Sequence, residues 1–386
     1  MKKITLITSK KKLVGGANIA SKRLINVLKK NFRVEVRAIN EKSLIGKLKY
    51  YIVRIIVRLF IGKTSFLNSL NIFTRINLNN IKTDLVLVDW VGEETVSLKD
   101  LSKINVPIIW VMLDMFAATS TEHYLNLPKK KGYYKKDAQN NYIKKIIYNK
   151  KTNLYDGNIN IIANSSFLEK FCKKSDLTKK LNIKRIYTPI DAEKWFREKE
   201  KYSKQQLNLD PTKKYILYGA HGGFKNYRKG GDLFEDSINK LGKMDENFEV
   251  IVLGGDQNQI KKINNINFHF RKVELDIKIQ RLYHSSSILT VSASRAESLP
   301  QFIVETILCK NPVVSFDVGG ISEIVSHKFN GYLTKCYDTD DFAMGMKYCI
   351  KNIKKNNLLN SRKNIYKMFE NKSISKEYVN FINKII

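Results

Sequence analysis

The sequence predicts an α/β protein built from two doubly wound, Rossmann-like domains. The chain has 386 residues, which is more than one hydrophobic core usually supports, and 43% of them are apolar. Short β-branched runs, typical of buried parallel strands, alternate with helical patterns along the whole chain. Alternation of this kind predicts parallel sheets with helices on both faces.

The N-terminal domain is predicted for residues 1–190. Its expected strands are short apolar runs: Ile4–Thr8, Val34–Ile39, Asp84–Trp90, Ile108–Leu113 and Ile159–Ala163. A helix is expected at Ala17–Lys30, directly after a loop that contains Gly15 and Gly16. Glycines in that position let the backbone approach a ligand closely, although a plain tight turn explains the pair equally well.

The C-terminal domain is predicted for residues 213–370, after a charged linker at residues 191–212. Its expected strands follow the same pattern: Tyr215–Ala220, Phe248–Gly255, Asn267–Phe270, Ile288–Ser292 and Pro312–Phe316. Helices are expected after Asp338, and the last of them, at about 371–386, is expected to pack back on the N-terminal domain.

Two carboxylates flank a strand-to-helix turn in the second domain. The run from Ser287 to Ser294 predicts a strand buried on both faces, and Pro300 suits the first turn of a helix that continues to Cys309. The free N–H groups and dipole of that helix N-terminus favour an anion such as a diphosphate. Glu297 precedes the helix and Glu305 lies within it, where a carboxylate can accept hydrogen bonds from the vicinal hydroxyls of a ribose. Taken alone, the pair is explained equally well without a ligand: Glu297 would compensate the helix dipole, and Glu305 would be a solvated helix residue.

The span from Ser292 to Val325 resembles the signature of retaining glycosyltransferases of family 4. That signature has a Glu, seven residues and a second Glu, then a Pro-Val-Val strand and a Gly-Gly turn, which here are Pro312–Val314 and Gly319-Gly320. The resemblance implies the GT-B fold, in which two Rossmann-like domains face each other across a cleft that binds a nucleotide sugar.

Further segments resemble the colanic-acid and exopolysaccharide type of these transferases. Trp110–Phe116 with Thr119 and His123-Tyr124 is similar to a motif of their first domain, and Tyr187–Asp191 to their Asn-Pro-Ile-Asp segment. Leu217–Ala220 and Arg228–Gly230 are similar to a strand and a Lys-Gly turn of the second domain.

The resemblance also assigns roles to residues. It implies catalytic roles for Glu297, Lys229 and Asp114, with Glu297 on the donor sugar. The implied donor-binding residues are Gly15, Gly16, Arg228, Ser298, Leu299, Pro300, Gln301, Phe302 and Glu305. Lys229 directly before Gly230 is also a good phosphate partner on chemical grounds, against the alternative of a solvated surface lysine. Asp114 is otherwise explained as a helix cap.

The chain departs from the family pattern at Leu113 and Ala220, and it also lacks the cysteines that accompany the His123 segment. The usual histidine before Asp114 is Leu113, so His123 or another group replaces it, the acceptor differs, or activity is impaired. His123 itself is predicted to be structural, because a lone histidine in a polar loop has no evident partner. The usual arginine after the strand-end glycine is Ala220, for which Arg228 or Lys225 could substitute.

Composition narrows the classes of partner. A formal net charge of +33 attracts polyanions, but the lysines are spread along the chain, and the denser stretch Lys129–Lys151 lacks the pattern of a nucleic-acid module. The four cysteines have no metal-type or redox-type spacing and are expected to be free thiols in the cytoplasm. Tyr50–Ile61 predicts a basic amphipathic helix, which suits either an anionic membrane surface or an ordinary core-facing position.

The predicted function is transfer of a sugar from a UDP- or GDP-sugar to a hydroxyl of a glycan or lipid-linked acceptor, with retention and without a metal or other cofactor. The expected setting is bacterial surface polysaccharide synthesis, in the cytoplasm or peripherally on the inner face of the cytoplasmic membrane. The alternatives are a catalytically impaired nucleotide-sugar-binding relative, a GT-B epimerase, and polyanion binding that high salt would abolish.

Overall fold

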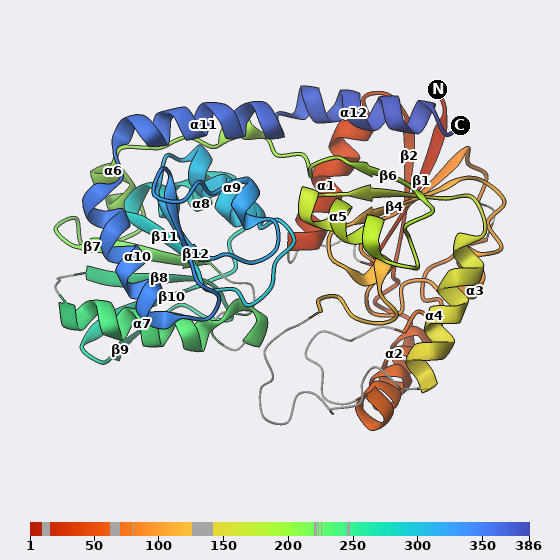
Figure 1. The fold of residues 1–386 in the computed structure, drawn as a ribbon, viewed down its shortest axis with the longest axis horizontal. Helices are drawn as coiled ribbons and strands as arrows, with labels where there is room; N and C mark the ends of the chain where they lie inside the picture. Colours follow the sequence, from red (N-terminus) through yellow and green to blue (C-terminus); the bar gives the residue numbers. More distant parts are fainter. Residues whose placement is uncertain are drawn as a thin grey trace. The chain divides into compact units, whose positions relative to one another are not determined.

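The computed structural model describes residues 1–9, 16–61, 70–79, 81–125, 142–219, 222, 224, 226–244 and 248–386. Contacts between residues divide the chain into two compact units. The first unit comprises residues 1–189 and 374–386, and the second comprises residues 190–373. Each unit is a three-layer α/β structure around one sheet (Figure 1).

The sheet of the first unit has six parallel strands in the order β2-β1-β3-β4-β5-β6. Its strands are β1 (Lys3–Thr8), β2 (Arg33–Ala38), β3 (Leu85–Val88), β4 (Ile108–Met112), β5 (Ile159–Ala163) and β6 (Asn182–Arg185). The five strands predicted for this domain are confirmed, and β6 is additional. The strand order reverses between β1 and β3, and ligands of such sheets bind at the carboxyl ends of the strands beside the reversal.

Helices cover both faces of this sheet (Figure 1). They are α1 (Gly16–Leu28), α2 (Leu44–Ile56) with its π-helical continuation η1 (Val57–Ile61), α3 (Leu98–Leu101), η2 (Phe116–Ala118), α4 (Tyr142–Tyr155), α5 (Ser166–Lys174) and α12 (Asn371–Asn383). From Ile374 onward α12 belongs to this unit, and Ile374, Tyr378 and Ile382 are buried in it.

The second sheet has seven strands in the order β13-β12-β11-β7-β8-β10-β9, with only β9 antiparallel to its neighbour. They are β7 (Lys214–Gly219), β8 (Phe248–Gly255), β9 (Gln259–Ile263), β10 (Ile266–Lys272), β11 (Leu289–Ser292), β12 (Val313–Phe316) and β13 (Gly331–Thr334). The predicted strands are again confirmed, except that Ala220 lies outside the described residues. Here the order reverses between β7 and β11, which places the expected ligand edge beside these two strands.

The helices of the second unit are η3 (Ala192–Lys194), α6 (Glu200–Gln206), η5 (Tyr227–Lys229), α7 (Gly231–Met244), α8 (Ile277–Ser286), α9 (Gln301–Leu308), η6 (Ile321–Glu323), α10 (Thr339–Asn352) and α11 (Lys355–Phe369). No helix among the described residues of the whole chain has the length and apolar character needed to cross a lipid bilayer.

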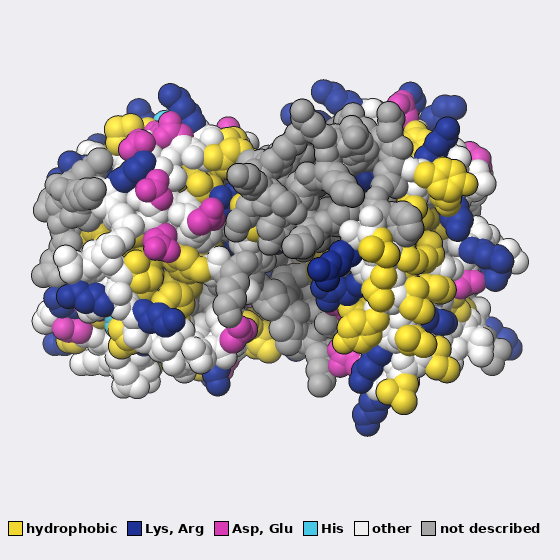
Figure 2. All heavy atoms as spheres, turned by 90° about the horizontal axis from the view of Figure 1, so that it is seen from below, with side chains coloured by type: hydrophobic (Ala, Val, Ile, Leu, Met, Phe, Trp, Pro, Cys, Tyr) yellow, Lys and Arg dark blue, Asp and Glu magenta, His cyan; other side chains and the backbone are white. Residues whose placement is uncertain are grey.

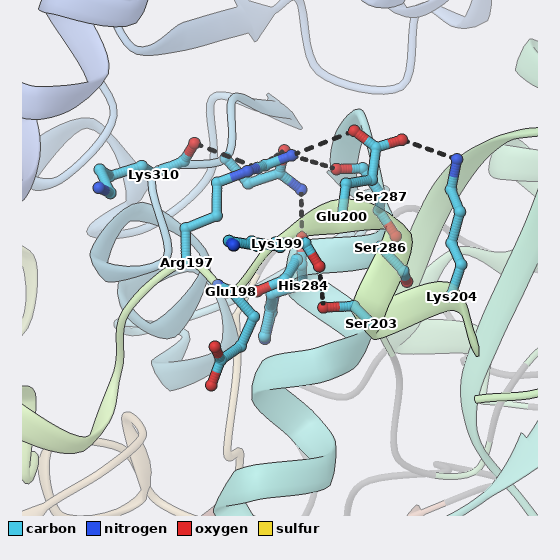
Figure 3. A network of polar contacts seen from close by, with 12 residues as sticks. Arg197, Glu198, Lys199, Glu200, Ser203, Lys204, His284, Ser286, Ser287 and Lys310 are labelled. Atoms are coloured by element: carbon cyan, nitrogen blue, oxygen red, sulfur yellow. Dashed lines mark hydrogen bonds and ion pairs between the residues drawn. The ribbon is translucent and has the colours of Figure 1, made fainter. Parts of the chain in front are cut away.

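The prediction of a linker at residues 191–212 is wrong, because this segment belongs to the second unit and contains η3 and α6. Trp195 is fully buried, and the charged side chains around it are held by a polar network (Figure 3). Lys204 Nζ lies 2.7 Å from Glu200 Oε1 and donates to the Lys213 carbonyl at 2.7 Å. The charged composition of this segment therefore predicted a linker where the chain is packed, because ion pairs hold its charged side chains in place.

Candidate functional site

Two loops meet at the carboxyl edge of the second sheet, beside the reversal of its strand order. One follows β11 and contains Arg295 and Glu297, and the other precedes α7 and contains Arg228 and Lys229. The backbone N–H of Arg295 donates to the Arg228 carbonyl at 2.7 Å, which joins the loops directly. The structure therefore brings together Glu297, Lys229 and Arg228, three residues that the sequence placed in the site.

Glu297 is the centre of a buried ion cluster. Its Oε1 atom lies 2.5 Å from Lys229 Nζ and 3.0 Å from Arg228 Nη1. Burial alone would raise the pKa of Glu297, but Lys229 and Arg228 outweigh it and lower the pKa to about 2. The stabilisation of the fold by this carboxylate is therefore complete above its ordinary pKa of 4.5 and is lost as the pH falls toward 2. Two cations against one carboxylate leave the cluster with a net positive charge for an anionic ligand.

Two glycines hold these loops in place. Gly230 has a φ of +68°, and a Cβ atom there would lie 1.9 Å from the Ala293 carbonyl oxygen. Gly319 has a φ of +62°, and its Cβ would lie 1.7 Å from the carbonyl oxygen of Glu297. Both positions combine a left-handed backbone with a backbone contact that excludes any side chain. The Gly319-Gly320 turn also anchors Ser298, the residue after Glu297, because the Gly320 N–H donates to the Ser298 carbonyl at 2.8 Å.

Arg295 is a supporting residue that the sequence analysis missed. Its guanidinium donates to both carboxylate oxygens of Asp232, at 2.8 and 2.6 Å, and to the Tyr227 carbonyl at 2.7 Å. Its position two residues before Glu297, in a loop that follows a buried strand, is the signal that could have identified it. Arg295 fixes the loop of Glu297 to the start of α7. It therefore positions the ion cluster and is not a member of it.

Helix α9 begins directly after Glu297. Pro300 occupies the cap position, one residue earlier than predicted, and Gln301 is the first helical residue. Ser298 and Leu299 are buried in the preceding turn, and Glu305 is also buried, which excludes the solvated-residue interpretation of that acid. The start of a helix carries the positive end of its dipole, and here that end follows Glu297 closely along the chain.

Phe302 is also in the first turn of α9, but its ring has a packing role. The ring centroid lies 4.9 Å from that of His284, and a Cβ atom on Gly219 would come within 2.2 Å of the ring. Phe302 therefore fixes α9 against the end of β7, and only its backbone remains for the donor site proposed from the sequence.

In the first unit, Asp114 and His123 form a buried pair after β4. His123 Nδ1 lies 2.6 Å from Asp114 Oδ2, and the imidazole stacks on Phe116 at a centroid distance of 4.9 Å. The view of His123 as a residue without a partner is therefore wrong, because a loop returns it to an aspartate nine positions earlier. A carboxylate at Nδ1 holds the imidazole in the tautomer whose Nε2 can accept a proton.

Asp114 is fixed by further contacts. Its Oδ1 accepts from the Phe116 N–H at 2.9 Å, as the helix-cap interpretation requires, and its Oδ2 accepts from Trp90 Nε1 at 3.1 Å. Burial alone would raise the pKa of Asp114, but His123 and these donors lower it, so the carboxylate stays ionised. Asp114 thus combines the cap role with the orientation of His123, and Leu113 precedes it at the edge of the sheet.

Some predicted residues lie outside the described part of the chain: Gly15, Ala220 and Lys225. Gly16 is described as the first residue of α1, and a Cβ atom there would meet nothing within 4 Å.

Lys151 belongs to the dense basic stretch of the sequence, yet it is fully buried. Its Nζ donates to the carbonyls of Phe116 at 2.5 Å and Thr119 at 3.0 Å, and lies 3.5 Å from the centroid of the Phe116 ring. Lys151 therefore supports the loop that carries the Asp114–His123 pair. Because it is buried, it does not attract polyanions.

Replacement of Lys151 by methionine should lower the free energy of unfolding by about 2–4 kcal/mol, because two buried carbonyls lose their donor. Burial lowers the pKa of Lys151 to about 7. Since the unfolded chain keeps this proton up to pH 10.5, wild-type stability should rise with pH above 7, and the variant should lack this contribution. Urea unfolding at pH 7 and 9 measures both effects. Lys150→Met, at an exposed neighbouring lysine, is the control, and an equal loss in both variants would contradict the assignment.

Comparisons with known proteins agree with this geometry. Residues 199–368, which lie within the second unit, match the family model described as Glycosyl transferases group 1. A curated relative, N-acetyl-alpha-D-glucosaminyl L-malate synthase of Bacillus anthracis, is 22% identical over 205 residues. That match covers 51% of this chain and 52% of the relative, or about half of its length.

Solved structures resemble the whole chain. Sucrose-phosphate synthase from Thermosynechococcus elongatus has a TM-score of 0.70 at 14% identity, covering 100% of this chain and 99% of its own. HepE from Anabaena, solved in complex with UDP-glucose, has a TM-score of 0.64 at 16% identity, covering 100% of both chains. These similarities confirm the GT-B fold that the sequence predicted.

Proposed function

We propose that this protein is a retaining glycosyltransferase that moves a sugar from a nucleoside-diphosphate sugar to a hydroxyl of a glycan or lipid-linked acceptor. The observation that carries the proposal is the ion cluster of Glu297, Lys229 and Arg228, which lies beside the start of α9 at the carboxyl edge of the second sheet. The cluster falls within the residues that match the group 1 glycosyltransferase family.

The diphosphate is assigned to the positive side of this cluster. Bond cleavage leaves negative charge on the departing diphosphate, and preformed cations and helix N–H groups stabilise such charge without rearrangement. Lys229 Nζ is buried and Arg228 shares Glu297 with it. We assign to Arg228 the role of the arginine that the family has at the position of Ala220. These groups are expected to suffice without a metal ion, so nucleotide release should persist in EDTA.

Glu297 and Glu305 are assigned to different parts of one donor. Glu297 holds hydroxyls of the sugar and faces the positive charge that develops at the anomeric carbon, while Glu305 accepts hydrogen bonds from the ribose. The bond from the anomeric carbon to the phosphate oxygen breaks, the acceptor oxygen bonds to that carbon, and the leaving diphosphate takes the acceptor proton. Because the phosphate serves as the base, the chemistry does not require an imidazole at Leu113.

Asp114 and His123 are assigned to the part of the substrates that the first unit binds. His123 Nε2, with Nδ1 bonded to Asp114, can accept a hydrogen bond from a sugar hydroxyl. This pair would replace the histidine that the family has at Leu113.

The donor base and the cellular setting are assigned from a solved neighbour, the cysteines and the sequence resemblance. HepE has been solved with UDP and with UDP-glucose, which makes UDP-sugars the first donors to test here. The free cysteines suit a reducing cytoplasm, and the resemblance to exopolysaccharide-type enzymes favours surface polysaccharide synthesis.

A catalytically impaired relative that binds donor without turnover is the second candidate, and Leu113 is the observation that favours it. Donor binding with no nucleotide release in the presence of any acceptor would support it.

The decisive experiment measures donor binding by the purified full chain with a panel of UDP-, GDP- and ADP-sugars. One class of donor should raise the melting temperature and release free nucleotide. Glu305→Ala should bind that donor about 30-fold to 150-fold more weakly, because two hydrogen bonds to a charged group are worth about 2–3 kcal/mol together. Glu193→Ala, at an exposed acid of the same unit, should bind like wild type. Equal binding by the two variants would remove the ribose site from Glu305.

A further inference from the structure

Helix α2 exposes an unusual amount of apolar side chain. Seven large hydrophobic residues of α2 and its continuation η1 are between 39% and 79% exposed. They form what we call the exposed stripe: Leu44, Ile45, Leu48, Tyr51, Ile52, Ile55 and Leu59. Figure 2 shows hydrophobic side chains gathered over this part of the first unit, with Lys and Arg side chains at the margins. Contiguous apolar surface of this kind marks an interaction site.

The exposed stripe is a second apolar face, distinct from the one that packs on the core. At 100° per residue, its six members in α2 fall within an arc of about 120°. The buried residues Gly46 and Val53 lie on the opposite side of the helix, and Val57 continues that buried face. An ordinary core-facing helix needs only the buried face, so the core accounts for Val53 and Val57 but not for the stripe. Ile56, just beyond the stripe by helical position, is partly buried against the core.

The charges that α2 and η1 themselves carry beside the exposed stripe are all positive. Lys47 and Arg54 lie along one of its edges by helical position, and Arg58 follows them in η1. Residues 42–83 contain eight lysines and arginines and no aspartate or glutamate. The chain average of 36 acidic residues in 386 would place about four there. Residues 42–83 themselves therefore offer a partner no acid, and an anionic surface fits this segment better than a basic one.

We infer that the exposed stripe docks the first unit on an anionic lipid bilayer, with α2 lying in the plane of the membrane surface. Apolar side chains enter the boundary between headgroups and acyl chains, while lysines and arginines at the margin pair with lipid phosphates. Tyr51, with an apolar ring and a polar hydroxyl, suits that boundary. The inference is independent of sugar transfer, although a membrane-bound position would bring the enzyme close to lipid-linked acceptors.

Vesicle sedimentation of the full-length protein tests the inference. Wild type should bind phosphatidylglycerol vesicles more tightly than phosphatidylcholine vesicles, and rising salt should weaken the binding. The triple variant Leu48→Gln, Ile52→Gln, Ile55→Gln should bind at least about tenfold more weakly. Its melting temperature should be unchanged, because the three side chains are exposed.

Two further variants make the result specific. Lys47→Gln, Arg54→Gln, Arg58→Gln should remove most of the preference for the anionic lipid. Met344→Gln, Leu359→Gln removes exposed hydrophobic residues of the second unit and should bind vesicles like wild type. Equal binding of wild type to both lipids, or no binding to either, would overturn the inference. A wild-type dimer that the stripe variant converts to a monomer, without vesicle binding, would show that a second copy covers the stripe.

Discussion

Replacing Lys229 with alanine is expected to lower nucleotide release from the donor by about 100-fold to 1,000-fold. Lys229 Nζ is the cation nearest to Glu297, at 2.5 Å, and it is buried among groups that hold it in place. Its removal takes away a preformed positive charge at the point where the departing diphosphate becomes more negative. Arg228 remains beside Glu297, so the carboxylate keeps a partner and the fold should survive.

The measurement is the steady-state rate of nucleotide release at saturating donor, with circular dichroism to establish folding. Lys229→Arg tests the geometry of the site. It keeps the positive charge but replaces the compact ammonium by a planar guanidinium, and should restore only a small part of the rate. Lys214→Ala, at an exposed lysine of β7, is the matched control. A Lys229→Ala enzyme that keeps more than a tenth of the wild-type rate would exclude Lys229 from the chemistry.

Replacing Gly319 with alanine is expected to destabilise the second unit by about 2–4 kcal/mol and to abolish donor binding. The left-handed φ of +62° disfavours any side chain, and the new methyl group would lie 1.7 Å from the Glu297 carbonyl oxygen. Backbone cannot move aside as a flexible side chain can. The turn must therefore shift, and Glu297 and Ser298 shift with it.

Gly255→Ala, in the same unit, is the control, because a methyl group there would make only ordinary contact, at 3.5 Å from the Arg271 carbonyl oxygen. Thermal unfolding of both variants, each with and without donor, gives the comparison. If Gly319→Ala melts like wild type and still gains stability from donor, the turn does not constrain Glu297.

The fold was predictable where a strand is buried on both faces. Leu85–Val88 is a continuous apolar run, Val313–Phe316 is apolar except for Ser315, and both are fully buried strands. The strands that were missed lie at or near sheet edges and carry little apolar signal. Asn182–Arg185 alternates exposed and half-buried residues, and Gln259–Ile263 contains two exposed lysines. Edge strands of this kind are held by ladder hydrogen bonds, which leave no hydrophobic pattern in the sequence.

The site was predictable where the chemistry follows one continuous motif. Glu297 and its neighbours were found because they follow a strand and precede a helix along the chain. The pair of Asp114 with His123 was missed because only the folded loop brings those side chains to 2.6 Å. The salt bridge from Arg295 to Asp232 joins residues 63 positions apart, and sequence spacing alone does not predict such a contact.

The return of α12 to the first unit has a consequence for how the chain is made. Residues 190–373 are inserted between two parts of the first unit. The two ends of the first unit meet, because Lys2 Nζ donates to the Ile386 carbonyl at 2.9 Å. Until residues 374–386 have been made, the first unit lacks the helix whose Ile374, Tyr378 and Ile382 are buried in it, so its apolar surface stays incomplete. The unit whose translation begins first is therefore the one that is completed last.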